Sequence, residues 1–357
     1  MNRCLTRRNV LAGAGLATGA TGMWAAVRPT RAWAESNFTF SLVAGSYGRA
    51  EIRSFVTEPG FEKKNKIYVS YDYGASNVRA AKVMTSCHEP IVTVYDAYPQ
   101  EADLFADGGC IRGYDLDIVT NYNDILDIVK EPSRNGISDF YAGYAVFGLG
   151  VTYNWKEIPR PRSFEDLLSP RLKGRVAVPA FSWIAPQFLY GVNAALGGTS
   201  GNVDKGFRFV ADLVKKNDAI ILPSTDSADH AFTTGQIVAM PFWNGRTNIL
   251  AKDGVPVKVV YVKGWVSTSS GLCITRGTKF GRAANLLVNN SLSPDAQVSF
   301  MRSVGYPPSN KRAVLPPDMT DWGVPTDALG RVAKINWDIV ARNMAANLER
   351  WNNEVLG

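Results

Sequence analysis

The chain has 357 residues, of which 46% are hydrophobic and 20% are charged, and its formal net charge is +7. A chain of this length can bury a large core, and one of about 320 residues or more usually divides into two domains. The sequence contains no low-complexity segment and no internal repeat, which excludes a disordered or repeat protein.

The first 34 residues have the pattern of a twin-arginine export signal. Arg7 and Arg8 precede an apolar, glycine-rich run over 12–27, and the tripeptide Ala-Trp-Ala at 32–34 supplies a small-x-small cleavage signal. A membrane anchor is the alternative, but glycines dilute the run, which falls short of the ~20 strongly apolar residues that span a bilayer. We therefore expect cleavage near Ala34 and a soluble mature protein in the periplasm.

The positive charge of the chain belongs largely to this leader. The leader carries five arginines and no acidic residue, so its removal leaves 34 basic residues against 32 acidic ones, a net charge of +2. Nucleic-acid binding depends on clustered cations that displace counterions, and the mature part has no lysine or arginine run. We therefore expect no nucleic-acid partner.

Three cysteines follow the leader, so at least one of them is a free thiol. Cys87 and Cys110 each end a predicted helix at the same edge of a sheet. The sequence supports a disulfide between them and two free thiols to the same extent. Cys273 lies in an apolar run and is expected to be buried and inert. The sequence has no C-x-x-C pair and contains only two histidines. We therefore expect no Cys/His metal site and no cofactor.

From residue 38 onward, short apolar runs alternate with amphipathic stretches, which is typical of a parallel α/β sheet with crossover helices. In the first unit we expect strands at 40–44, 67–71, 91–95 and 145–153, and helices at 49–63, 76–86 and 98–106. In a second unit we expect strands at 175–178, 219–222, 237–240 and 257–261, and helices at 186–195, 203–216 and 227–234. A strand at 270–275 and helices at 279–290 and 332–351 complete the chain.

The second unit reads as an insertion into the first. The chain would leave the first lobe through 149–153 and return near 267–272, so two crossings would join the lobes, with ligands held at the carboxyl ends of the strands. Two unrelated domains in tandem are the alternative. We assign 35–149 and 270–310 to lobe 1, and 150–269 and 311–357, with the C-terminal helices, to lobe 2.

Six motifs, in this order along the mature chain, resemble those of periplasmic solute-binding proteins of ABC importers, in the group of the spermidine and putrescine binders. They are FEKKNKIYV at 61–69, PRSFEDLL and LKGRV at 161–176, FWNGR at 242–246, GVPV at 254–257, LSPDAQ at 292–297 and GYPPSN at 305–310. The resemblance implies a two-lobed (type II) α/β fold with the ligand cleft between lobes joined by a hinge. It also implies a non-enzymatic, monomeric receptor that delivers a small solute to a membrane permease and an ATPase on other chains.

The candidate ligand-binding residues follow the predicted strands of both lobes, and Trp243 and Asn244 match a pocket segment of the polyamine binders. Several have an alternative structural role: Ser76 and Asp226 as helix N-caps, and Trp243 as a core residue. The candidates of the first lobe are Ser46, Tyr47, Ser76, Asn77, Asp96 and Tyr98. Those of the second lobe and the returning strand are Ser182, Trp183, Asp226, Trp243, Asn244, Arg246, Ser269 and Ser270.

The charge of these residues bears on the ligand. Polyamine binders pair ammonium groups with carboxylates, but the segment 180–183 and Ser270 stand where the family has acids. Hydroxyls, helix N-termini and Arg246 favour a small organic anion or zwitterion, such as a carboxylate, phosphonate or amino-acid-like compound, whose amine would meet Asp96 or Asp226. A polyamine held by Asp96, Asp226 and Asp229 is the alternative.

Two other function classes receive less support from the sequence. Ser182 and His230 could be nominated as a hydrolase pair, but no G-x-S-x-G motif surrounds any serine, and no P-loop or G-x-G-x-x-G follows a strand. A ferric-ion binder with the same fold would use tyrosine ligands, and the sequence has no adjacent tyrosine pair.

Overall fold

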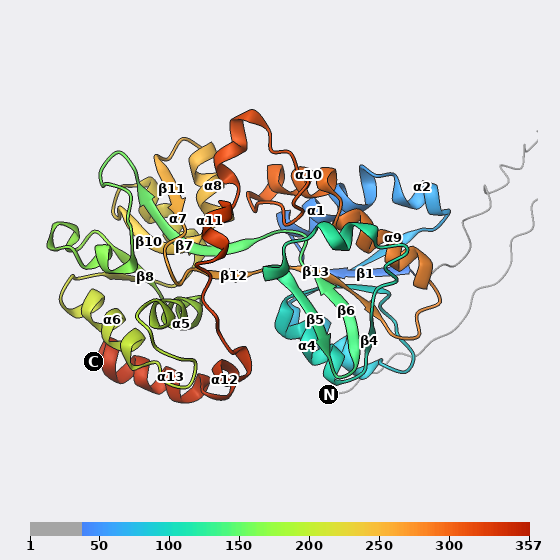
Figure 1. Ribbon diagram of the computed structural model, residues 1–357, viewed down its shortest axis with the longest axis horizontal. Coiled ribbons are helices and arrows are strands. Elements are labelled where there is room, and N and C mark those ends of the chain that lie inside the picture. The colour runs from blue at the N-terminus through green and yellow to red at the C-terminus, as the bar shows by residue number, and fades with distance from the viewer. Residues whose placement is uncertain (1–37) are drawn as a thin grey trace, which may run out of the picture. The chain divides into compact units, whose positions relative to one another are not determined.

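The structure is a computed structural model that describes residues 38–357. The predicted leader lies outside the described residues. Two sheets with their own helices form two lobes, which Figure 1 shows side by side. None of the described helices has the length and apolar character needed to cross a bilayer.

The first lobe is built on a five-stranded mixed sheet in the order β2-β1-β3-β13-β4. Its strands are β1 (Phe38–Leu42), β2 (Val69–Tyr73), β3 (Val94–Ala97), β4 (Ile111–Arg112) and β13 (Gly271–Thr275). β1 pairs in parallel with β2 and β3, whereas β13 is antiparallel to β3 and β4. A hairpin of β5 (Lys130–Arg134) and β6 (Ile137–Ala142) lies beside it.

Several helices of the first lobe differ from the sequence prediction. They are α1 (Ser46–Glu51), the π-helix η1 (Ile52–Thr57), α2 (Phe61–Asn65), α3 (Ser76–Thr85), α4 (Pro99–Asp107), η2 (Thr120–Asp124), η3 (Asp127–Val129), α9 (Gly281–Ser291) and α10 (Pro294–Val304). The single helix predicted at 49–63 is wrong, because η1 ends at Thr57 and a turn follows, in which Gly60 has a left-handed φ of 65° and precedes α2. α10 was missed although Ser293 caps it and Pro294 opens it.

The second lobe is built on β7 (Phe147–Asn154), a strand whose residues are all buried. β10 (Ala239–Trp243), β11 (Val257–Val260) and β12 (Val266–Thr268) pair antiparallel with it, and β8 (Ala177–Pro179) pairs in parallel with β9 (Ile220–Leu222). The prediction of a parallel sheet for this lobe is therefore wrong for β7. The predicted lobe boundary at 149–150 falls inside β7. The sequence could not place this boundary, because a continuous apolar strand has the same pattern whichever sheet it joins.

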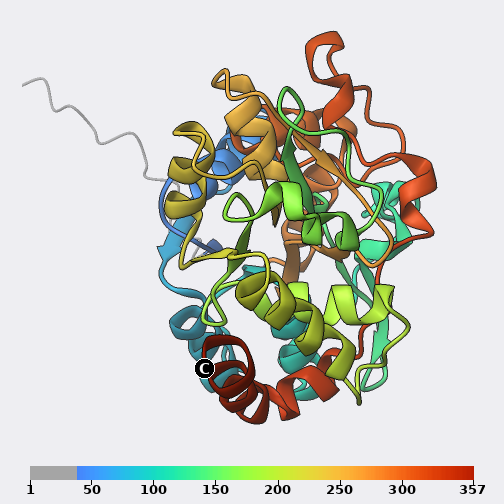
Figure 2. The same cartoon turned by 90° about the vertical axis from the view of Figure 1, so that its left-hand side faces the viewer.

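The helices of the second lobe cover this sheet, and the C-terminal helices lie below α5 and α6 in Figure 2. They are η4 (Phe164–Leu168), η5 (Pro170–Leu172), α5 (Ala185–Ala195), α6 (Asp204–Lys215), α7 (Thr225–Thr233), α8 (Asn244–Lys252), η6 (Pro317–Trp322), α11 (Thr326–Leu329), α12 (Trp337–Arg342), α13 (Met344–Arg350) and η7 (Trp351–Leu356). Trp351 packs on Phe181 with ring centroids 5.6 Å apart, and the Arg350 guanidinium lies 4.1 Å from the Phe207 ring centroid. The predicted helix at 332–351 is instead two short helices and a π-turn that begin at Trp337.

The two lobes are joined where three chain segments lie side by side. The chain leaves the first lobe between β6 and β7 and returns between β12 and β13, and Gly143 and Gly271 form an antiparallel bridge at this crossing. A Cβ on Gly271 would lie 2.5 Å from the Ala142 carbonyl oxygen, so this close approach requires glycine. The Val146 N–H donates to the Pro307 carbonyl oxygen at 2.9 Å, which brings the segment after α10 alongside. The exit lies before β7, not at the predicted 149–153.

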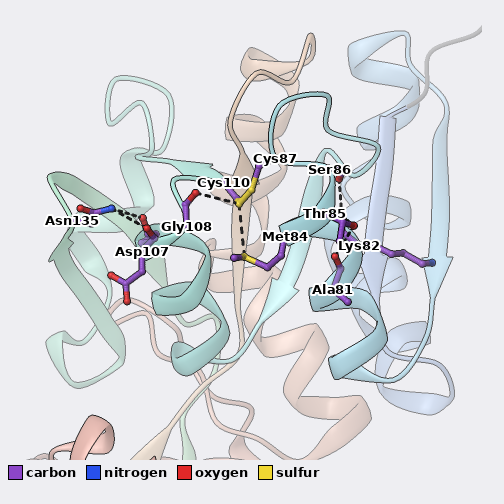
Figure 3. Close-up of a disulfide and its surroundings, with 11 residues drawn as sticks. Ala81, Lys82, Met84, Thr85, Ser86, Cys87, Asp107, Gly108, Cys110 and Asn135 are labelled. Atoms are coloured by element: carbon purple, nitrogen blue, oxygen red, sulfur yellow. Dashed lines mark hydrogen bonds between the residues drawn. A yellow bond between two sulfur atoms is a disulfide. The ribbon is translucent and has the colours of Figure 1, made fainter.

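Cys87 and Cys110 form a disulfide, drawn in Figure 3, that links the ends of α3 and α4 across 23 residues of sequence. This is the pairing that the sequence left open. Cys110 Sγ also lies 3.8 Å from Met84 Sδ, and Cys273 is a buried free thiol, as predicted.

Replacing both Cys87 and Cys110 by alanine should lower the free energy of unfolding by about 3 kcal/mol, because the unfolded chain regains the entropy of a loop of this length. Urea unfolding of the oxidised wild type and the double variant measures the difference. Dithiothreitol should destabilise the wild type and leave the double variant unchanged. An equal response of both proteins to the reductant would contradict the disulfide.

Candidate functional site

A cavity of about 460 Å³ lies where the two lobes face each other, a volume within the range of small-molecule sites. Its wall contains residues from α1, α3 and α4 of the first lobe and from α5, β10 and β12 of the second. The lining residues are Tyr47, Ser76, Tyr98, Gln100, Glu101, Phe147, Ile184, Gln187, Trp243, Val266, Thr268, Tyr306 and Trp337.

Aromatic side chains make up much of the wall. Phe147, the first residue of β7, is at the centre of one group: its ring centroid lies 4.2 Å from that of Tyr306, 6.2 Å from Tyr47 and 6.4 Å from Tyr98. Burial raises the pKa of Tyr306 to about 12, and burial also raises the pKa of Tyr47 and Tyr98. All three phenols are therefore neutral at physiological pH and can donate hydrogen bonds to a ligand.

Three helix N-termini contribute residues to this wall. The N-cap residues of α3, α5 and α8 are Ala75, Ile184 and Trp243, and no side chain caps any of the three helices. Not all of the first N–H groups are free, because the Gly245 N–H donates to Asn244 Oδ1 at 2.8 Å, the Val78 N–H donates to Asn77 Oδ1 at 3.0 Å, and Pro186 in α5 has no N–H. Each helix start still carries a partial positive charge. This arrangement can accept the anionic group of a ligand without a lysine or arginine, and neither occurs among the lining residues.

Glu101 is the one acidic residue among the lining residues, and both of its carboxylate oxygens are engaged. The Tyr98 N–H donates to Oε2 at 3.0 Å, and the Tyr95 hydroxyl donates to Oε1 at 2.9 Å. The carboxylate thus fixes the start of α4 and adds negative potential on the first-lobe side of the cavity. The wall therefore contains both helix N-termini with partial positive charge and one carboxylate.

A buried polar network lies behind Tyr47 and reaches the crossing between the lobes. The hydroxyls of Tyr47 and Tyr144 are 2.8 Å apart, and Tyr144 Oη lies 3.0 Å from Glu51 Oε1 and 3.1 Å from Asp96 Oδ1. Tyr144 belongs to the outgoing segment, and Ser270, which donates its hydroxyl proton to Asp96 Oδ1, belongs to the returning one.

Asp96 is predominantly a structural residue. It is 2% exposed, and its Oδ2 lies 4.0 Å from Arg79 Nη2. Burial raises the pKa of Asp96 to about 6, opposed by the charge of Arg79 and the hydrogen bonds from Ser270 and Tyr144. Burial, and next the charge of Asp96, raises the pKa of Glu51 well above its usual value.

Four of the sequence-predicted site residues lie in the cavity wall, namely Tyr47, Ser76, Tyr98 and Trp243. Ser76 is the first residue of α3 and not its N-cap. The other candidates are placed elsewhere. Ser269 and Ser270 are buried, with Ser269 Oγ 2.9 Å from the Tyr141 hydroxyl.

Arg246 and Asn244 have partners within the protein. Arg246 forms an ion pair with Asp229 and is absent from the cavity wall, which removes the guanidinium expected to bind an anionic ligand and also the carboxylate of Asp229 expected to bind an amine. Asn244 is fully buried, donates to the Tyr261 hydroxyl at 2.9 Å and accepts from the Gly148 N–H at 3.0 Å. It holds α8 against β7.

The remaining candidates lie outside the cavity wall. Asp226 is exposed in the first turn of α7, and Ser224, not Asp226, caps this helix by accepting from the Ser227 N–H at 3.2 Å. Trp183 packs on Phe242 with ring centroids 6.0 Å apart. Ser46, Asn77 and Ser182 are exposed.

Nine of the wall residues were not predicted from the sequence, and two of them, Tyr306 and Gln187, lie in segments that carried a signal. Tyr306 belongs to the GYPPSN motif, and Gln187 lies in the first turn of α5. Gln187 Oε1 is buried and has no hydrogen-bond partner within residues 38–357. Phe147 and Trp337 come from an apolar run and a C-terminal helix, and no local pattern marks either as a cavity residue.

The fold and the interlobe cavity agree with the comparison of the chain with known families. Residues 60–326 match the family of bacterial extracellular solute-binding proteins. The match covers most of the chain, so the protein belongs to this family. The family places it outside the cytoplasm and confirms the resemblance seen in the sequence. A search of curated protein sequences finds no significant match.

Solved structures confirm the two-lobed α/β fold. An ABC transporter protein from Clostridium perfringens is similar with a TM-score of 0.73 and 18% identity over 89% of this chain and 99% of its own. The GABA receptor Atu4243 has a TM-score of 0.69 and 18% identity, over 88% of this chain and 96% of its own. The spermidine/putrescine substrate-binding protein PotD from Streptococcus pneumoniae has a TM-score of 0.70 and 14% identity, over 88% of this chain and 98% of its own.

The raised pKa of Asp96 predicts the pH dependence of stability. Between about pH 4 and pH 6 the folded state keeps a proton that the unfolded state has lost, so the free energy of unfolding should fall by about 3 kcal/mol as the pH rises through this window. Asp96→Asn should reduce the slope of the free energy of unfolding against pH by the equivalent of up to one bound proton. Urea unfolding at pH 4, 5, 6 and 7 measures it.

The control for this experiment is Asp226→Asn, because Asp226 is exposed and lies far along the chain from the network. A slope for Asp96→Asn equal to that of the wild type and of the control would show that Asp96 does not retain its proton in the folded state.

Proposed function

We propose that the protein is the periplasmic substrate-binding component of an ABC importer and captures a small organic anion or zwitterion between its lobes without transforming it. Membership of the extracellular solute-binding family and the interlobe cavity support this proposal. A permease and an ATPase on other chains would complete the importer, as expected for a fold shared with substrate-binding proteins of ABC transporters. The receptor would act as a monomer.

Export would follow the twin-arginine signal in the leader, with cleavage near Ala34. The sequence pattern supports this step, and an extracellular family is consistent with it. The mature protein would then meet its solute in the periplasm.

The observation that carries the ligand proposal is the set of helix N-termini at the cavity. The N-cap residues of α3, α5 and α8 make no side-chain cap, so each helix start brings partial positive charge to the cavity, and the lining residues include no lysine or arginine that could bind an anion in their place. The neutral tyrosines add hydroxyl donors. The anionic head of the solute would lie against these donors.

An ammonium group on the same solute would find a different part of the wall. Tyr98 and Tyr47 offer aromatic faces on the first-lobe side, where Glu101 adds negative potential. Because both poles are present, a zwitterion fits better than a simple anion. The GABA receptor Atu4243, which has the same fold, is named for a compound of this class.

A polyamine is the second candidate, and the abundance of aromatic side chains in the wall favours it, because such rings stabilise ammonium groups. The polyamine-binding neighbour PotD shares the fold. The proposed carboxylate partners Asp96, Asp226 and Asp229 do not line the cavity, which weakens this candidate. Thermal shift with amino acids, ω-amino acids, organic acids, phosphonates and polyamines separates the two classes.

Trp243→Ala should weaken binding of the solute that stabilises the protein in this screen by roughly 1 to 3 kcal/mol, because the variant loses an aromatic wall from a desolvated site. Titration calorimetry measures the change in Kd. Unchanged affinity would exclude Trp243 from the binding site.

The matched comparison is Arg246→Ala, three residues along the chain. Because Arg246 pairs with Asp229 and lies outside the cavity wall, its loss should change the Kd by less than threefold for either a zwitterion or a polyamine. A large loss of affinity confined to acidic solutes would contradict this placement and restore Arg246 as a ligand contact.

A further inference from the structure

A second cavity of about 510 Å³ borders the first. Gln100, Val266, Thr268 and Trp337 line both cavities, so these four residues form the partition between them. Gln100 is an exposed side chain in the first turn of α4, and Trp337 is the first residue of α12. Rotation of these two side chains would connect the cavities.

The second cavity is closed by the chain segment 329–337, which leads from α11 to α12 and which we name the C-terminal strap. Two hydrogen bonds hold the strap to the second lobe: the Ala333 N–H donates to the Trp265 carbonyl oxygen at 2.9 Å, and the Gly264 N–H donates to the Arg331 carbonyl oxygen at 2.8 Å. The opposite wall belongs to the first lobe, with Ile128, Val129 and Glu131. Both lobes therefore bound this cavity too.

The second cavity is lined by one cationic residue, Lys334, which is exposed, and by one acidic residue, Glu131, which is partly buried. Glu131 and the hydroxyl of Ser267 can accept hydrogen bonds from the cationic end of a ligand. Ser267 Oγ is buried and finds no hydrogen-bond partner in the described part of the chain. A buried hydroxyl without a partner costs free energy, and rotation about χ1 would let it bond to a ligand in the cavity. In the first cavity, Gln187 Oε1 is likewise buried and has no hydrogen-bond partner among the described residues.

Glu131 supplies a half-buried carboxyl group to the second cavity. Burial, and next the charge of Asp103, raises the pKa of Glu131 to about 7, while Arg134 opposes the shift. Arg134 is itself engaged by three other carboxylates, those of Asp103, Asp107 and Asp338. A ligand ammonium group would supply the cation that the carboxylate of Glu131 lacks.

We propose that the second cavity receives the far end of an elongated solute, whose anionic head lies against the helix N-termini of the first cavity and whose terminal ammonium group pairs with Glu131 and Ser267. The solute class is then an unbranched chain with a carboxylate at one end and an ammonium group several methylenes away. This inference rests on the proposed zwitterion-binding function and narrows it.

Titration calorimetry with 4-aminobutanoate and 7-aminoheptanoate tests the inference. The wild type should bind the longer probe at least tenfold more tightly than the shorter one. Glu131→Gln, which keeps the shape of the side chain and removes its charge, should weaken binding of the longer probe at least tenfold and change that of the shorter probe less than twofold. Asp338→Asn is the matched control, because it removes a nearby acid that does not line either cavity.

Four outcomes overturn the inference. Equal affinity of the wild type for both probes would show that the second cavity takes no part in binding. An equal effect of Glu131→Gln and Asp338→Asn on the longer probe would reduce the role of Glu131 to general electrostatics. Binding of neither probe would overturn the zwitterion proposal itself, and this inference with it, whereas tight binding of the shorter probe alone would leave the zwitterion proposal standing.

Discussion

The placement of two buried carboxyl groups at the crossing between the lobes is the constraint on which the rest of the structure depends. Glu51 and Asp96 could not be buried without hydrogen-bond partners, and the two connecting segments supply these partners through Tyr144 and Ser270. The same hydroxyl of Tyr144 bonds to Tyr47 in the cavity wall. One polar network therefore links the two connecting segments to the cavity wall at Tyr47.

The sequence predicted the features that repeat locally. Apolar runs of the length of strands located nine of the strands to within a few residues, whereas β4, β5, β6 and β12 were missed. Tyr47, Ser76, Tyr98 and Trp243 lie in the cavity wall because each is at or near the carboxyl end of a predicted strand, or starts the helix that follows one. These predictions do not depend on the partner that each strand selects.

The sequence did not predict which side chains and strands pair with each other, because pairing depends on the tertiary structure. The guanidinium of Arg246 was expected at the ligand but pairs with Asp229 from α7, and Asp96 was expected to face an amine but is buried against Arg79. β7 was assigned to the wrong sheet because a fully buried strand has no alternation that reveals its neighbours. Phe147 and Trp337 reach the cavity from elements that meet only in the folded protein.

The central claim is that a solute binds between the lobes and is released unchanged. A crystal structure of the mature protein with the solute that stabilises it most in solution tests this claim directly. The account predicts intact solute in contact with Trp243 from one lobe and Tyr98 from the other. Solute bound to a single lobe away from these residues, or electron density for a reaction product, would contradict it.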